Sequence, residues 1–141
     1  MSTIQEAVAE FGAFHVLVGP DFTDAHKVVT DARDSLSRVV AHYYPEHSVY
    51  PTRVAGLVAE FKALCAVDTN TTHILYTCCP LVLNECQPAE ASIVTRNAAG
   101  EVVVTRFDRT KDFARRSGAF ALGELWLTFC DGDKEAQLVP E

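Results

Sequence analysis

The sequence predicts a single small α/β domain, built from a mostly parallel sheet with one β-hairpin and flanking helices. The chain has 141 residues, of which 48% are apolar, and this is enough for one domain with its own core. Short β-rich runs alternate with helical periods, and strands separated by helices pair in parallel. We expect this domain to occupy residues 1–130 and to be followed by a flexible C-terminal tail over residues 131–141.

The first predicted strand and the first predicted helix lie between residues 14 and 42. Residues 14–18 form a short apolar run that ends at Gly19-Pro20, a pair that stops a strand. Apolar residues then recur at steps of three and four, with polar residues between them. This period predicts an amphipathic helix from Asp24 to about His42.

A connection with two prolines separates this helix from the clearest helical pattern of the chain. Residues 41–50 break the period, and Pro45 and Pro51 exclude a continuous helix through them. Pro51 suits a first helical turn, and the apolar residues after it again follow a helical period. The residues of this helix that we expect in the core include Leu57, Phe61 and Leu64.

The second half of the chain contains the remaining predicted strands. Residues 73–77 form a β-rich run, after which Pro80 can open a short helix. The runs 92–95 and 102–107 flank a four-residue connection that ends in glycine, so they should pair as a hairpin. A last helix, which can begin as early as Phe113, has apolar residues at Ala121, Leu122, Leu125, Trp126 and Phe129.

Charge and composition exclude several classes of function. Twelve Lys and Arg against nineteen Asp and Glu give a net charge of -7, the wrong sign for a protein that binds phosphate backbones. The N-terminus lacks the basic start and apolar stretch of a secretory signal. No window approaches the ~18 apolar residues of a membrane span. We therefore expect a cytoplasmic protein that binds neither membrane nor nucleic acid directly.

Two adjacent cysteines are candidates for thiol chemistry. Cys78 and Cys79 precede Pro80 at the end of a predicted strand, and a thiol near a helix N-terminus can have a lowered pKa and act as a nucleophile. A cysteine enzyme also needs a base, and the spacing does not place a histidine beside the pair. The candidate bases are His42, His47 and His73.

The same cysteines do not predict a metal site or a disulfide framework. The chain has five cysteines, an odd number, and no C-x-x-C pair. Adjacent side chains point apart on a strand, so a site built from Cys78, Cys79, Cys86 and His73 matches no common zinc module. We expect reduced cysteines and neither a metal nor a cofactor.

The turn at residues 18–22 is the nearest match to a phosphate-binding loop. Such a loop needs glycines followed by lysine and a hydroxyl residue, and the sequence contains no Gly-Lys pair. Pro20 removes a backbone donor, and Asp21 adds a negative charge. The segment is therefore predicted to be a simple turn, with nucleotide binding as the alternative.

An aromatic and imidazole cluster surrounds Pro45. Tyrosine gives a large contact area at a small entropic cost, so this cluster is a candidate surface for a protein partner. The alternative is a loop that packs onto the domain. The members of the cluster are His42, Tyr43, Tyr44, His47 and Tyr50.

Residues 39–127 resemble the C-terminal half of ABC-type ATPases, and most closely the stand-alone ATPases of the RecF/OLD-like group. In that family one strand ends in two acidic residues followed by Pro-Glu-Asn-Gly, and the next strand ends in Thr-Thr-His-Ser-Pro. The matching segments of this chain are Tyr43-Tyr-Pro-Glu-His-Ser48 and Thr77-Cys-Cys-Pro80. The order of the helix, the second strand and the hairpin also agrees with the family.

The resemblance implies the fold of these ATPases without their catalysis. In the family the acidic pair holds magnesium and polarises water, while the histidine contacts the γ-phosphate. Here Tyr43, Tyr44 and Cys78 stand at those positions. Of the Pro-Glu-Asn-Gly motif, this chain retains the Pro-Glu pair, which ends at Glu46. The family's phosphate-binding half lies outside the similarity. The chain is thus expected to be an inactive pseudo-ATPase rather than an enzyme.

The resemblance also suggests a partner. We expect a regulatory subunit that binds a larger protein, such as an ATPase or a nuclease of a phage-defence or DNA-processing assembly. A cysteine-dependent enzyme or redox sensor at Cys78 or Cys79 is one alternative, and nucleotide binding without hydrolysis in a shared site is the other. A homo-oligomer is compatible with the sequence.

Overall fold

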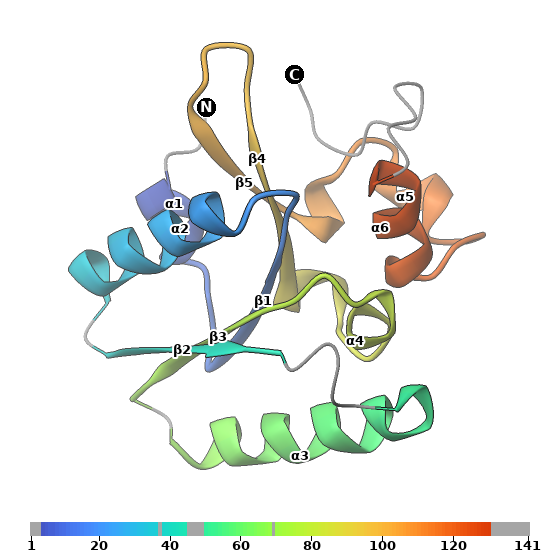
Figure 1. The fold of residues 1–141 in the computed structure, drawn as a ribbon, viewed down its shortest axis with the longest axis horizontal. Helices are drawn as coiled ribbons and strands as arrows, with labels where there is room; N and C mark the ends of the chain where they lie inside the picture. Colours follow the sequence, from blue (N-terminus) through green and yellow to red (C-terminus); the bar gives the residue numbers. More distant parts are fainter. Residues whose placement is uncertain (1–3, 37, 45–49, 69, 131–141) are drawn as a thin grey trace.

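Five strands form one sheet in the order β2-β3-β1-β4-β5, as Figure 1 shows. The computed structural model describes residues 4–36, 38–44, 50–68 and 70–130. The first four strands in this order are parallel, and β5 pairs antiparallel with β4. This topology confirms the predicted α/β class with a mostly parallel sheet and one hairpin. The strands are β1 (Phe14–Val18), β2 (Val39–Tyr43), β3 (Thr72–Tyr76), β4 (Ala91–Arg96) and β5 (Val102–Arg106).

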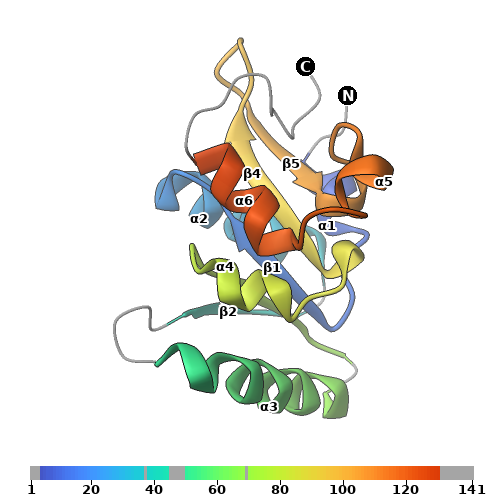
Figure 2. The ribbon, with the colours of Figure 1, turned by 90° about the vertical axis from the view of Figure 1, so that its right-hand side faces the viewer.

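Helices cover both faces of the sheet. One apolar cluster packs α1 and α2 against one face, and a second cluster packs α3, α4 and α6 against the other. Figure 1 shows the sheet between α2 and α3, and Figure 2 shows α3, α4 and α6 along one side of the molecule. The helices are α1 (Ile4–Val8), α2 (Phe22–Ser35), α3 (Val54–Val67), α4 (Pro80–Asn84), α5 (Phe113–Arg116) and α6 (Leu122–Cys130).

The helix α2 is shorter than its sequence pattern predicts. It ends at Ser35, whereas the apolar period suggested a helix to about His42. Val39 and Val40 instead belong to β2, where they pair with β3. Both residues are β-branched and fit a pleated strand well. The local pattern of this segment suits either a helix or a strand. Its hydrogen bonds to β3 therefore determine that it forms a strand.

The helix α3 buries a different set of residues from the one predicted. Val54, Val58 and Cys65 are buried, and Phe61 packs partly buried against the same cluster. By contrast, Leu57 is 36% exposed and Leu64 is 71% exposed, so the expectation that both lie in the core is wrong. The face of the helix that is formed by residues 54, 58, 61 and 65 therefore packs against the sheet. The leucines lie on the neighbouring flank.

The C-terminal elements agree with the prediction more closely. The hairpin forms as expected, with Val94 opposite Val104 and Gly100 at a φ of 80° in the turn. A helix does begin at Phe113, but it ends at Arg116 and is separate from α6. The predicted tail, residues 131–141, lies outside the described residues.

The N-terminal residues 4–11, where no element was predicted, pack on the α2 face of the sheet. Val8 and Phe11 are buried there. The Glu10 carboxylate pairs with Arg109 at 2.8 Å and with Arg106 at 3.2 Å. Since these ion pairs are partly exposed, they add specificity of position more than stability.

Candidate functional site

The carboxyl ends of β1, β2 and β3 meet at one edge of the sheet. The Tyr44 N–H donates to the Tyr76 carbonyl at 3.0 Å, and the Thr77 N–H donates to the Leu17 carbonyl at 3.1 Å. These bonds hold the three strand ends side by side. In open α/β sheets, ligands bind outside the carboxyl ends of the strands.

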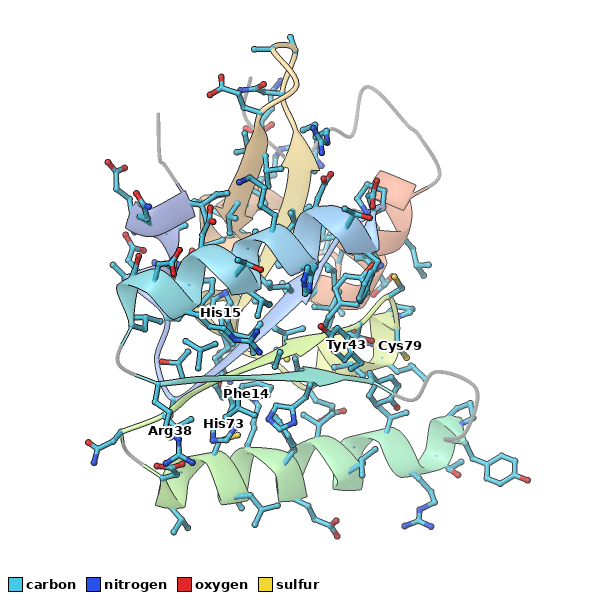
Figure 3. All side chains as sticks on the ribbon, turned by 60° about the vertical axis from the view of Figure 1, so that its left-hand side comes forward. Phe14, His15, Arg38, Tyr43, His73 and Cys79 are labelled. Atoms are coloured by element: carbon cyan, nitrogen blue, oxygen red, sulfur yellow. The ribbon has the colours of Figure 1, made fainter. Side chains whose placement is uncertain are left out.

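An aromatic cluster lies at this edge and is here named the edge cluster: Phe22, Tyr43 and Tyr76. The Phe22 ring centroid is 5.3 Å from that of Tyr43 and 5.6 Å from that of Tyr76. Phe22 is 50% exposed and Tyr43 is 51% exposed. Figure 3 shows Tyr43 at the same end of the sheet as Cys79. The cluster therefore presents two half-exposed rings that rest on a third.

The turn after β3 is fixed by side chains from other elements. The Trp126 indole N–H donates to the Cys78 carbonyl at 3.2 Å, and the Cys79 N–H donates to the Thr77 hydroxyl at 2.9 Å. The Tyr76 hydroxyl donates to the Gly19 carbonyl at 3.1 Å and lies 3.5 Å from the Cys78 sulfur. The exposed Cys78 thiol is thus held next to the edge cluster.

In the turn after β1, which was the nearest match to a phosphate-binding loop, Gly19 and Asp21 both have structural roles. A Cβ atom at Gly19 would lie 2.6 Å from the Val94 carbonyl oxygen, so only glycine fits between β1 and β4. The Asp21 carboxylate caps α2 by accepting from the Thr23 N–H at 2.8 Å. Both residues serve packing and capping.

The close approach at Gly19 gives a first testable prediction. We expect Gly19→Ala to lower the free energy of unfolding by about 1–3 kcal/mol, because the added methyl group must push apart two paired strands. Gly12→Ala is the matched control, since nothing lies within 4 Å of a Cβ atom there. Urea denaturation of both variants measures the difference. Equal stability of the two variants would show that β1 and β4 can separate at no cost.

The carboxylate in the first turn of α2, Asp24, is also engaged. Asp24 is 4% exposed and receives hydrogen bonds from Arg96 Nη2 at 2.7 Å and Arg96 Nε at 3.1 Å. The hydrogen bond and the charge of Asp24 raise the pKa of Arg96. This bidentate pair connects α2 to β4. Asp24 therefore has a structural partner and is not presented to a metal or a nucleotide.

Two of the three candidate bases, His42 and His73, contact each other instead, and the third, His47, lies outside the described residues. His42 Nε2 lies 3.0 Å from His73 Nδ1, and both rings pack edge-on against Phe61 of α3. Burial and the neighbouring His73 lower the pKa of His42. The pair lies on the α3 side of the sheet, while Tyr43 contacts Phe22 on the α2 side. Neither histidine is therefore placed as a base for Cys78.

The predicted partner surface does not form one face. Tyr43 and Tyr50 are exposed, but Tyr44 is buried and His42 faces α3. The alternation of side chains along β2 separates His42 from Tyr43. Glu46 and His47 lie outside the described residues. Phe22 and Tyr76, which sequence reasoning did not select, join Tyr43 in their place.

Two further cysteines, Cys65 and Cys86, have structural roles. Cys65 and Cys86 are buried, and burial raises the pKa of Cys86 to about 12. Among the residues that the structure describes, no group of three or more His, Cys, Asp or Glu is arranged to hold a metal ion. Within those same residues, no helix has both the length and the apolar character needed to cross a membrane.

No protein-family model matches this chain, and no curated protein is significantly similar to it in sequence. The edge cluster and the neighbouring Cys78 are the features that the fold presents at the carboxyl edge.

Proposed function

We propose that this chain is a catalytically inactive ATPase-like module that binds a larger protein partner through the edge cluster. One observation carries the proposal: Phe22 and Tyr43 are half exposed at the edge where an enzyme of this class needs its catalytic groups. Aromatic side chains in such positions are typical anchors of protein interfaces.

The chemistry at this edge supports binding rather than phosphoryl transfer. Transfer of a phosphoryl group needs carboxylates to position metal and water, and cations to stabilise charge. Here Tyr43 and Cys78 stand where the resemblance would put a carboxylate and a histidine. Asp21 is occupied with capping α2 and Asp24 with Arg96. Both acidic side chains therefore already have structural roles.

The nature of the partner follows from the resemblance alone. We propose an ATPase or a nuclease of a phage-defence or DNA-processing assembly, met in the cytoplasm. A net charge of -7 favours a protein over a nucleic acid as the direct ligand. In this role the chain adds a regulatory surface to the assembly and no catalytic group.

The test is a pull-down of the tagged chain at native expression, compared among variants of equal folding by circular dichroism. Phe22→Asp and Tyr43→Asp should each weaken capture of the partner by about tenfold or more, the usual effect of losing an aromatic anchor. Phe120→Asp is the matched control, because Phe120 is 49% exposed and lies outside the cluster. If all three variants capture the partner equally, the edge cluster is not the interface.

A thiol activity is the second candidate, and the exposed Cys78 beside the Tyr76 hydroxyl favours it. An iodoacetamide titration near pH 7 should then find one thiol that reacts much faster than the others. Cys78→Ser should abolish this fast phase, and Cys79→Ser should leave it unchanged. Uniform slow labelling would remove the thiol candidate.

A further inference from the structure

The outer edge of β2 has no partner among the described residues. β2 is the last strand of the sheet on its side. The Arg38 carbonyl accepts from the Thr72 N–H, and the Tyr44 N–H donates to the Tyr76 carbonyl. Residues 38 and 44, and the even-numbered residues between them, therefore direct their backbone groups toward β3. Because neighbouring residues of a strand alternate, Val39, Ala41 and Tyr43 direct their N–H and C=O groups outward.

Among the described residues, this edge carries none of the usual protection against pairing with another strand. Natural edge strands are blocked by lysine, proline, bulges or a covering element. The five residues Val39–Tyr43 contain no lysine, no arginine, no acidic residue and no proline; the first four are partly buried and Tyr43 is exposed. In Figure 3, β2 runs across the view between α2 and α3.

An apolar flank of α3 continues the same surface. Phe61 faces the sheet, and Lys62 reaches Glu90, just before β4, at 2.9 Å. The helical period places Leu57 and Leu64 on the opposite flank from Lys62, which is the flank toward the free edge of β2. Both leucines are exposed. The free edge and this flank are together named the β2–α3 surface: Val39, Ala41, Tyr43, Leu57 and Leu64.

We propose that the β2–α3 surface binds a second copy of this chain about a two-fold axis through Ala41. The two β2 strands then run antiparallel, with Ala41 opposite its own copy and Val39 opposite the partner's Tyr43. Each outward-facing residue exchanges both backbone hydrogen bonds with the residue opposite it. Pairs of β-branched and aromatic residues across strands are favourable. The two sheets become one continuous sheet.

The charges of α3 fit this two-fold arrangement. The Phe61 ring centroid is 4.7 Å from that of His42, next to Ala41, so the axis passes near the middle of α3. The two α3 helices then lie antiparallel, with Leu57 facing the partner's Leu64. Arg53, at the start of the helix, faces the partner's Asp68, at its end. Opposite charges and opposed helix dipoles therefore both favour the antiparallel orientation that a two-fold axis imposes on the two helices.

The first experiment uses the unaltered protein. Sedimentation equilibrium should find a dimer at about 100 µM that dissociates on dilution. Amide exchange followed by NMR should find Val39, Ala41 and Tyr43 protected about tenfold or more in the dimer and unprotected in the dilute monomer. Val40 and His42, which face β3, should stay protected in both. A protein that is monomeric both at about 100 µM and after dilution overturns the proposal. This holds whether its outward-facing amides exchange fast or are protected by another part of the same chain.

Two substitutions should change the dimer Kd in opposite directions. Ala41→Pro removes an outward-facing N–H and leaves every hydrogen bond to β3 intact. Edge strands accept proline at such a position. The substitution should raise the dimer Kd about tenfold or more. Ala41→Ser keeps the N–H and is the matched control. Glu60→Gln should lower the Kd about twofold to fivefold, because Glu60 lies beside the axis near its own copy.

The outcomes separate this proposal from the proposed function. An unchanged Kd in both Ala41→Pro and Glu60→Gln would overturn the two-fold arrangement. If Ala41→Pro fails to fold, Glu60→Gln and the exchange pattern of the unaltered chain still decide. Phe22 lies outside the β2–α3 surface, so Phe22→Asp should leave the dimer Kd unchanged while it weakens capture of the larger partner. Each proposal can therefore fail without the other.

Discussion

Trp126→Ala should lower the free energy of unfolding by about 3–5 kcal/mol, as expected for a large side chain removed from a packed core. Trp126 is 2% exposed and is the only tryptophan of the chain. It packs α6 against the core on the α3 side of the sheet. Since domains are typically stable by about 5–15 kcal/mol, this loss is a large fraction of the stability of a typical domain. Urea denaturation followed by circular dichroism measures the change.

Two further variants divide this effect into its parts. Trp126→Phe keeps most of the ring but loses the hydrogen bond to the Cys78 carbonyl, so it should cost about 1–3 kcal/mol. Leu127→Ala, at an exposed neighbour of Trp126, should change stability by about 0.5 kcal/mol or less. If Trp126→Ala costs no more than Leu127→Ala, then α6 is not docked on the sheet as described.

Local signals were sufficient to predict most of the fold. The strand at residues 14–18 is an apolar run with a stop signal behind it, and the hairpin around Gly100 has its turn residue in place. The boundary between α2 and β2 was not predictable in the same way. Val39 and Val40 continue the helical period of α2 and are also β-branched. Only the pairing with β3, a contact between distant residues, decides between the two structures.

The candidate site was predictable only in part. The resemblance pointed to Tyr43, Tyr44, Glu46 and Cys78. Tyr43 and Cys78 are exposed at the carboxyl ends of their strands, whereas Tyr44 is buried and Glu46 lies outside the described residues. Phe22 and Tyr76 were missed because the edge cluster joins three elements that are far apart in the sequence. The grouping of His42 with Tyr43 failed for a simpler reason. Adjacent residues of a strand face opposite sides, and this segment had been assigned to the end of a helix and a loop.

Acid should destabilise this protein through one buried histidine. His15 is 1% exposed, stacks on Phe11 with ring centroids 3.8 Å apart, and has its Nε2 atom 2.7 Å from the Ser92 hydroxyl. The pKa of His15 is lowered from 6.5 to about 3, mainly by burial and to a smaller extent by the charge of Arg106, while the charge of Asp108 opposes the shift. The ring therefore stays neutral in the folded protein throughout the mildly acidic range.

The sign of the pH dependence follows from where the proton binds. Below pH 6.5 the unfolded chain protonates His15 but the folded chain does not, so the free energy of unfolding falls as the pH falls toward 3. One proton is worth about 1.4 kcal/mol per pH unit. The stability contribution of neutral His15 is complete above pH 6.5, and about 2 kcal/mol of it should be lost between pH 7 and pH 5.

His15→Gln separates this proton from the other titrating groups of the chain. Glutamine can still hydrogen bond to Ser92 but does not titrate, so the variant should be less stable than the parent at pH 7 because it loses the stack on Phe11. Its stability should then fall less steeply between pH 7 and pH 5, by about 2 kcal/mol. Urea denaturation at several pH values measures both curves, and parallel curves would mean that His15 is protonated in the folded protein. Converging curves would identify buried His15 as the group that sets the acid sensitivity of the α1–α2 side of the sheet.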